Sequence, residues 1–367
     1  MRVFFFVSSV YTKESSRGGI ADLLYQLIPS LMSISNEAYE IEVVSLFGET
    51  EDKTPFPVTI LQNEHQHSSD SSVFKKLQFW FLASLSLMKF IIRYRATLRS
   101  AKIVSCSPGA SFILPFFFKN VLIWENVSFF TKGQLVARIR LFIFYLFNCN
   151  VIVPTKYEES KLTAFSLMPD VTYIQDWFDE KIEPVKRQRV INRIRFMSAG
   201  ALESRKGFDL LLTSIANLPE NTRSLLHFTI YGSGSQYSNL KDQIRRFELS
   251  DHVVLAGFVS DLADRYRDYD AFILSSRYEG FPLVMVNALA SGMPVLAFDC
   301  ETGPAEIVVS GANGMLIENG SCEAMCRAIV QFAATFNSDR YFENSVESAR
   351  PYALKTVLPV WNRLLGS

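Results

Sequence analysis

The chain has 367 residues, 49% of them hydrophobic and 20% charged, and its formal net charge at pH 7 is zero. This length exceeds that of one ordinary domain, so we expect two domains of about 170 to 190 residues, each with a large core. The charge balance gives no general attraction to nucleic acid, no zinc-finger or RNA-binding spacing is present, and no apolar run is long enough for a helix that spans a bilayer.

The N-terminal half starts with a strand, a glycine turn and a helix. MRVFFFVSSVY resembles the start of a signal peptide, but its apolar run is short and has no small-x-small cleavage site, so we interpret it as a strand. Gly18 and Gly19 form the turn into an amphipathic stretch from Ile20 to Leu31. Further strands are predicted at Ile41–Phe47, Lys102–Cys106, Val121–Trp124 and Val151–Pro154, with helices between them and a polar loop at 63–72.

Residues 73–140 form a basic and aromatic stretch. They contain eleven Lys or Arg and one acid, Glu125, and they include the runs FWFLASLSLMKFII and FILPFFF. Such a mixture suits a helix in the headgroup region of an anionic membrane. A buried helix with solvated basic ends is the competing interpretation, and we favour membrane contact.

Five cysteines are scattered along the chain without a C-x2-C pair, at Cys106, Cys149, Cys300, Cys322 and Cys326. This pattern suits reduced thiols in a cytosolic setting. Cys322 and Cys326 lie one helical turn apart, where we expect ordinary packing and not a metal site.

The C-terminal half alternates strand and helix almost without interruption. Its strands are IRFMSAG, LHFTIYG, HVVLAG, AFIL and PVLAF. This alternation is typical of a doubly wound parallel sheet. A polar and charged stretch at 179–193, with little hydrophobic periodicity, precedes it, and we interpret that stretch as the interdomain linker.

The segment 271–309 is the most informative part of the chain. Its strand AFIL runs into a loop at 275–280, and ligands bind at the carboxyl ends of strands in such sheets. Pro282 suits the first turn of the next helix, whose unpaired N–H groups face an anion, and Gly280 lets the backbone approach closely. The segment therefore predicts a phosphate-binding site.

These residues resemble the donor-site motif of the retaining glycosyltransferases of family 4, S-R-x-E-G-F-P-x-x-x-x-E-A-x-A-x-G-x-P-V. Glu279 holds the first acid of the motif, and Asn287 stands where the second is expected. The resemblance implies that Glu279 lies by the donor sugar and that position 287 holds the ribose hydroxyls. Asn donates and accepts hydrogen bonds there without the strength of a charge, so we expect weakened or altered donor binding. Capping of the following helix is the competing role for Glu279.

The resemblance also implies the fold, which is α/β of the GT-B type, with two Rossmann-like doubly wound domains facing a central cleft. It predicts an acceptor-binding domain at 1–178, the linker at 179–193, a nucleotide-sugar-binding domain at 194–350 and a C-terminal helix at 351–367 that crosses back to the first domain. The C-terminal half resembles the family strongly, and the N-terminal half resembles it in outline.

A second loop resembles the family's G-R-L-x-x-x-K-G, in which Arg and Lys hold the donor phosphates. Lys206 matches the Lys, Ala201 replaces the Arg, and Arg205 stands in the same loop. The resemblance makes Glu279 and Lys206 the catalytic candidates. Further donor-side candidates are Gly18, Gly19, Arg205, Gly232, Gly280, Phe281, Pro282, Leu283, Val284 and Asn287, and the acceptor-side candidates are Arg17, Glu125 and Asn126. The glycine turn and the lone lysine also fit a plain strand-to-helix turn and a solvated surface charge.

Many family members have a histidine near the reacting carbon, but here the sequence WEN occupies that place. Retaining transfer of this class uses the departing phosphate to take the acceptor proton, so a missing histidine does not abolish activity. We see no acidic cluster of the D-x-D kind that serves a nucleotide-bound metal, and the resemblance implies a family that is usually metal-independent. We therefore expect no metal and no cofactor apart from the nucleotide sugar, with a UDP-sugar favoured.

The leading hypothesis is a retaining hexosyltransferase that moves a hexose or N-acetylhexosamine from a nucleotide sugar to a glycan, lipid-linked or free, in polysaccharide assembly. Its setting is then cytoplasmic, or peripheral on the cytoplasmic face of an anionic membrane, with no nucleic-acid partner. A catalytically degenerate GT-B protein that binds a glycan or a partner is the alternative, motivated by Ala201, Asn287 and the missing histidine. A dinucleotide oxidoreductase comes third, because no complete G-x-G-x-x-G is present.

Overall fold

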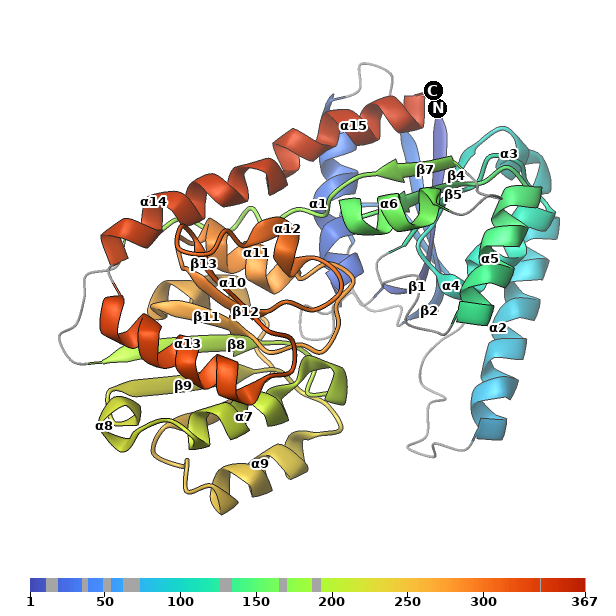
Figure 1. The fold of residues 1–367 in the computed structure, drawn as a ribbon. Coiled ribbons are helices and arrows are strands. Elements are labelled where there is room, and N and C mark those ends of the chain that lie inside the picture. The colour runs from blue at the N-terminus through green and yellow to red at the C-terminus, as the bar shows by residue number, and fades with distance from the viewer. Residues whose placement is uncertain are drawn as a thin grey trace. The chain divides into compact units, whose positions relative to one another are not determined.

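The computed structural model describes residues 1–10, 19–34, 39–48, 54–61, 73–125, 134–164, 170–186, 193–336 and 338–366. The chain divides into two compact units: unit 1 comprises Met1–Gln175 and Val357–Ser367, and unit 2 comprises Asp176–Thr356. Each unit is built on a parallel sheet with helices on both faces (Figure 1). The predicted class, α/β with two Rossmann-like doubly wound domains, is confirmed.

The sheet of unit 1 has the strand order β3-β2-β1-β4-β5-β6-β7. The strands are β1 (Arg2–Val10), β2 (Glu40–Gly48), β3 (Val58–Ile60), β4 (Lys102–Ser105), β5 (Leu122–Trp124), β6 (Asn150–Val153) and β7 (Asp170–Tyr173). Phe4 and Phe6 of β1 face one side of the sheet and Phe5 faces the other, and all three are buried. Both faces are covered, which explains why the strand reads as an unbroken apolar run.

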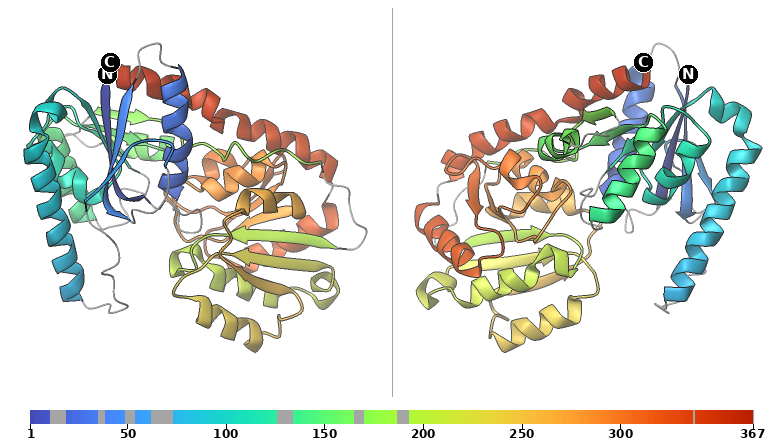
Figure 2. Two further views of the ribbon diagram at one scale, coloured as in Figure 1. Left: turned by 180° about the vertical axis from the view of Figure 1, so that it is seen from behind. Right: turned by 45° about the vertical axis from the view of Figure 1, so that its right-hand side comes forward.

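The helices of unit 1 lie on both faces of this sheet. They are α1 (Gly19–Ile34), α2 (Val73–Arg93), α3 (Arg95–Arg99), α4 (Pro108–Ile113), α5 (Gln134–Leu146) and α6 (Lys156–Thr163), with a short 3-10 helix, η3 (Leu114–Phe116). Apolar residues of α2, α4 and α5 form one core with Phe4 and Phe6. Figure 2 shows α1 on the opposite side of the strands from α2 and α5.

The C-terminal helix α15 (Leu354–Gly366) belongs to unit 1 from Val357 onward. Its Trp361 is fully buried, with ring centroids 4.6 Å from Trp124 and 6.5 Å from Phe5. The hydroxyl of Tyr39 donates to Oδ1 of Asn362 at 2.7 Å. The end of the chain is therefore part of the core of unit 1.

The sheet of unit 2 has the order β10-β9-β8-β11-β12-β13. The strands are β8 (Ile194–Ala199), β9 (Leu226–Tyr231), β10 (Val253–Gly257), β11 (Ala271–Leu274), β12 (Val295–Phe298) and β13 (Gly314–Ile317). The chain winds outward from β8 to β10 and then returns to the other side of β8 with β11. The carboxyl ends of β8 and β11 thus adjoin at the point where the strand order reverses, which is where α/β sheets bind ligands.

Helices cover both faces of the unit 2 sheet. They are α7 (Phe208–Ala216), α8 (Glu220–Arg223), α9 (Tyr237–Arg246), α10 (Leu262–Arg265), α11 (Leu283–Ala290), α12 (Pro304–Ile307), α13 (Cys322–Thr335) and α14 (Ser338–Ala349), with 3-10 helices η4 (Ser204–Lys206), η5 (Tyr266–Asp268) and η6 (Arg350–Tyr352). Residues of α7, α9 and α13 share a core with Phe196, and residues of α11 and η5 share a second core with Met197 on the other face.

The division between the units falls after Gln175, so residues 179–186 of the expected linker lie within unit 2. The N–H of Phe178 donates to the carbonyl of Tyr352 at 3.0 Å, and the N–H of Val185 donates to that of Ser291 at 3.1 Å. Residues 187–192 of the expected linker lie outside the described residues.

Replacing Trp361 tests whether α15 is part of the core of unit 1. We expect Trp361→Ala to lower the free energy of unfolding by about 3–5 kcal/mol, because it leaves a cavity beside Trp124. Urea unfolding measures the loss. Val360→Ala is the matched control, since Val360 is 40% exposed and should cost about 1 kcal/mol or less. Equal losses in the two variants would contradict this role of Trp361.

Candidate functional site

Two loops meet at the adjoining carboxyl ends of β8 and β11. The first runs from Gly200 to Gly207 and includes η4, and the second runs from Ser275 to Pro282. The N–H of Arg277 donates to the carbonyl of Arg205 at 2.8 Å, and Oγ of Ser275 donates to the carbonyl of Lys206 at 3.0 Å. One backbone hydrogen bond and one bond from a serine side chain therefore join the two loops.

Gly207 permits this close approach. Its φ is +63°, and a Cβ added there would lie 2.0 Å from the carbonyl oxygen of Ser275. No side chain fits that space, and the left-handed backbone is strained for any residue that has one. The glycine after Lys206 is thus required by the contact between the loops.

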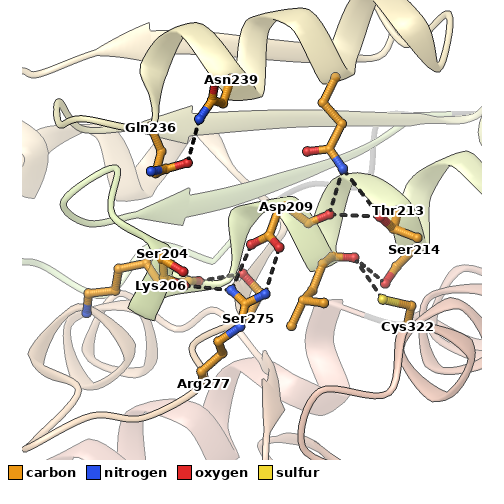
Figure 3. A network of polar contacts seen from close by, with 12 residues as sticks. Ser204, Lys206, Asp209, Thr213, Ser214, Gln236, Asn239, Ser275, Arg277 and Cys322 are labelled. Carbon is orange, nitrogen blue, oxygen red and sulfur yellow. Dashed lines mark hydrogen bonds and ion pairs between the residues drawn. The ribbon is translucent and has the colours of Figure 1, made fainter.

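Arg277 also links the second loop to α7. Its guanidinium donates to both carboxylate oxygens of Asp209, at 2.8 and 2.6 Å, and to the carbonyl of Ser204 at 2.6 Å (Figure 3). These hydrogen bonds, with the charge of Arg277, hold the pKa of Asp209 below its ordinary value. The sequence motif predicts that Arg277 lies in this loop but does not reveal its role, because its partner lies 68 residues away in the chain.

Glu279 and Lys206, the two catalytic candidates, form an ion pair. Nζ of Lys206 donates to Oε1 of Glu279 at 2.5 Å, and the hydroxyl of Ser276 donates to the same oxygen at 2.6 Å. The Glu279 side chain is 4% exposed and that of Lys206 is 11% exposed. Nη1 of Arg205 lies 3.9 Å from the other carboxylate oxygen. One buried acid therefore contacts both basic residues of the first loop.

Glu279 does not cap α11. The N-cap of this helix is Pro282 without a side-chain hydrogen bond, and the helix begins at Leu283, one residue later than expected. Gly303 packs against the ring of Pro282, since a Cβ at Gly303 would lie 2.4 Å from Cδ of that proline. The hydroxyl of Thr302 donates to the carbonyl of Glu279, so the 302–303 turn supports the same loop.

The other donor-side candidates in unit 2 lie around this pair. Gly280 and Pro282 are buried, and Phe281, Leu283 and Val284 are half-buried. The ring of Phe281 lies 5.6 Å from that of Tyr352. A Cβ at Gly232 would lie 1.9 Å from the carbonyl oxygen of Gly200, so Gly232 serves the packing of the turn after β9 against the first loop.

Asn287, which replaces the expected acid, is held within unit 2. Its Oδ1 accepts from the N–H of Asp179 at 3.0 Å. Its side chain also hydrogen-bonds the hydroxyl of Tyr266, a residue whose pKa burial raises. One contact is thus to the segment before β8 and the other to η5.

The candidates of unit 1 fall into two groups. Arg17, Gly18 and Asn126 lie outside the described residues, and Gly19 begins α1. Glu125 is buried and paired with Arg140, which is also buried. The structure thus gives Glu125 a partner within its own unit.

The site offers anion recognition. A diphosphate would meet the ammonium of Lys206 and the guanidinium of Arg205, and Glu279 would be left to accept from hydroxyl groups of a sugar. Within the described residues, no group of three or more His, Cys, Asp or Glu side chains could hold a metal ion.

Residues 179–347, which include both loops, match the family model described as Glycosyl transferases group 1. The C-terminal part of the chain is therefore similar to the group 1 glycosyltransferases. The predicted enzyme class, a hexosyltransferase, and the resemblance noted from the sequence are confirmed.

Two relatives show how far the similarity extends along this glycosyltransferase. Amylovoran biosynthesis glycosyltransferase AmsD of Erwinia amylovora is 24% identical over 368 residues, which cover 96% of this chain and 97% of AmsD. The poly(ribitol-phosphate) alpha-N-acetylglucosaminyltransferase of Staphylococcus aureus is 32% identical over 168 residues, which cover 44% of this chain and 33% of that protein.

Solved structures confirm the GT-B fold. The crystal structure of TarM matches with a TM-score of 0.76 at 15% identity and covers 100% of this chain and 99% of its own. Anabaena HepE in complex with UDP and glucose matches with a TM-score of 0.75 at 16% identity and covers 100% of this chain and 99% of its own.

We expect Arg277→Ala to lower the free energy of unfolding by about 1–2 kcal/mol at pH 7, since it removes charge-assisted hydrogen bonds that solvent partly screens. The lowered pKa of Asp209 makes this contribution fully present above the ordinary value of 3.8, and it is lost as the pH falls through the lowered value. Urea unfolding of wild type and variant at pH 7 and at pH ~3 should show the difference shrinking in acid.

The control for this experiment is Arg245→Ala. Arg245 pairs with Asp242, but both side chains are about two-thirds exposed, so the loss should stay below about 0.5 kcal/mol at either pH. A difference between Arg277→Ala and wild type that does not change with pH would rule out Asp209 as the partner that matters.

Proposed function

We propose that this glycosyltransferase transfers a hexose or N-acetylhexosamine from a UDP-sugar to a glycan in polysaccharide biosynthesis, with retention of configuration. The observation that carries the proposal is the buried pair of Lys206 and Glu279 at the adjoining ends of β8 and β11. The similarity to AmsD, whose name refers to amylovoran biosynthesis, supports the polysaccharide setting. Structural neighbours crystallised with UDP support the choice of nucleotide.

In the proposed reaction, Lys206 and Arg205 stabilise the diphosphate as it departs. The leaving group gains negative charge in the transition state, so positive groups aimed at it lower the barrier. Glu279 then accepts hydrogen bonds from the hydroxyls of the donor sugar and fixes its orientation. The bonds between the loops keep these side chains in place before the donor arrives.

The departing phosphate takes the proton of the acceptor hydroxyl in this proposal. Among the described residues, His227 stands near the amino end of β9 and His252 precedes β10. Because parallel strands end at the same edge of a sheet, both lie at the edge opposite to Lys206 and Glu279. Neither is placed to act as a general base for transfer.

We place the reaction at the cytoplasmic face of a membrane, with a lipid-linked glycan as acceptor. In the described part of the chain no helix has the length and hydropathy to span a bilayer. The cysteines Cys106, Cys149, Cys300, Cys322 and Cys326 are free thiols, which suits a reducing compartment.

The alternative function is a glycan-binding or partner-binding protein without catalysis. Two departures from the family motif favour this alternative. Ala201 stands in the first loop where the motif has an arginine, and Asn287 stands on α11 where the motif has an acid. Donor-dependent product formation separates the two functions.

The Lys206–Glu279 pair is tested by hydrolysis of UDP-, GDP-, ADP- and CMP-sugars with and without EDTA. We expect slow hydrolysis of a UDP-sugar that resists EDTA. Lys206→Ala and Glu279→Gln should each lower turnover by about 10²–10³-fold, because each removes a group that acts on the reacting centre.

Lys241→Ala is the control for these variants, since Lys241 is exposed on α9 of the same unit and should leave turnover unchanged. Wild-type turnover in Lys206→Ala or Glu279→Gln would overturn the site. No response to any donor would favour the alternative function.

Asn287→Glu tests the departure from the family motif. A carboxylate accepts from the N–H of Asp179 as Asn287 does, and it binds hydroxyl groups through stronger, charge-assisted bonds. We expect UDP affinity that equals or exceeds that of wild type by up to about tenfold, measured by calorimetry. Asn287→Ala, which removes both hydrogen-bonding atoms, should weaken binding. Unchanged affinity in both variants would show that position 287 does not contact the nucleotide, and weaker binding by Asn287→Glu would contradict the expected benefit of a carboxylate.

A further inference from the structure

The outward sides of α2 and α5 in unit 1 carry large apolar side chains in contact with solvent. On α2, Phe81 is 63% exposed, Leu85 42% and Ile92 66%. On α5, Ile139 is 48% exposed, Phe142 50% and Leu146 58%. We call these six side chains the α2–α5 face. Exposed apolar residues normally occur singly, and a cluster of this kind marks a binding surface.

The two helices present these side chains to the same side of unit 1. Inward residues Ala83, Leu87 and Ile91 of α2 and Leu141 and Phe144 of α5 belong to one buried core over one face of the sheet. Figure 2 shows both helices on that side in each view. Their outward sides therefore turn away from the sheet together.

Basic side chains surround the α2–α5 face. Lys89 and Arg93 of α2 and Arg138 of α5 are exposed, and α2, α3 and α5 contain no Asp or Glu. No acid pairs with Lys89, Arg93 or Arg138 in the parts of the chain that the structure describes. The one acid of the region, Glu125, is buried with Arg140.

Unit 2 shows the opposite pattern. Its exposed Arg245, Arg265 and Arg327 each pair with an acid one helical turn away. The formal net charge of the whole chain is zero. The positive charge around the α2–α5 face is therefore local, and it stands beside apolar side chains instead of carboxylates.

We propose that the α2–α5 face docks on an anionic lipid surface. The apolar side chains enter the boundary between headgroups and acyl chains, and Lys89, Arg93 and Arg138 contact lipid phosphates. A second copy of this chain would place like charges against each other across the contact, which disfavours self-association. Docking would hold the enzyme beside a lipid-linked acceptor; only this consequence rests on the proposed function.

The test uses sedimentation of the full chain with two kinds of vesicle, phosphatidylcholine alone and an equal mixture of phosphatidylcholine and phosphatidylglycerol. We expect binding to the anionic vesicles at least about tenfold stronger than to the neutral ones at low salt. High salt should weaken this binding but leave part of it, because salt screens charges and does not remove apolar contacts.

Two variants separate the charged and apolar contributions. The triple variant Lys89→Glu, Arg93→Glu and Arg138→Glu should lose about tenfold or more in partition to anionic vesicles, since a basic side chain near such a surface contributes about fivefold. The double variant Ile92→Ser and Phe142→Ser should lose a similar factor and most of the binding that survives high salt.

The matched controls lie in unit 2. Leu225→Ser with Val309→Ser removes two apolar side chains of 44% and 61% exposure, and Lys241→Glu reverses one exposed charge. These controls should bind vesicles as wild type does. Thermal unfolding and UDP-sugar hydrolysis without lipid check that each variant is folded, and they report on the donor site independently of docking.

Three outcomes would overturn the proposal. The first is that the wild-type chain does not bind anionic vesicles at low salt. The second is that the controls lose as much vesicle binding as the α2–α5 variants. The third is that the wild-type chain forms dimers, which the double variant Ile92→Ser and Phe142→Ser turns into monomers without any change in vesicle binding. The last result would show that a second copy covers the face.

Discussion

The close approach of Gly207 to the carbonyl of Ser275 is the constraint on which the proposed donor site depends. Backbone contact at this point fixes the distance between the two loops, and the bond between Arg277 and Asp209 ties the second loop to α7. Along the chain, Lys206 directly precedes Gly207 and Glu279 follows Arg277 by two residues. The separation of 2.5 Å between Nζ of Lys206 and Oε1 of Glu279 thus follows from how two strand ends are joined, before any ligand is considered.

The ion pair of Lys206 and Glu279 is suited to binding an anion, because its two members can change partners. Burial of an isolated charge is unfavourable, and Lys206 and Glu279 each give the other a partner of opposite charge in a place with little water. In the proposed function, a diphosphate brings more negative charge than one carboxylate and competes for the ammonium, and sugar hydroxyls donate hydrogen bonds to the carboxylate. Each residue then changes its partner: Lys206 pairs with the diphosphate, and Glu279 accepts hydrogen bonds from the sugar.

The sequence predicts much of unit 2 and less of unit 1. AFIL and PVLAF are apolar runs between turn residues, and both are buried strands. The strand β7, DVTY, is half-exposed at the edge of its sheet, and α14, SDRYFENSVESA, has a mostly polar sequence, so neither has the apolar pattern that reveals an element. The motif gave the positions of Glu279 and Lys206, but the partners of Arg277 and Glu125 depend on which segments the fold brings together.

Arginine and lysine serve three physical purposes in this chain, and their surroundings separate them. Lys206 is buried beside one acid and can change partners, Arg140 is buried with Glu125 and aromatic rings that hold it in place, and Lys89 and Arg93 remain in solvent beside apolar side chains. Arg93 lies over the ring of Tyr94, 5.6 Å from its centroid, whereas water solvates Lys89. The proposed anionic lipid surface binds a cation and an apolar side chain at once, because it offers phosphates to Lys89 and Arg93 and acyl chains to Ile92.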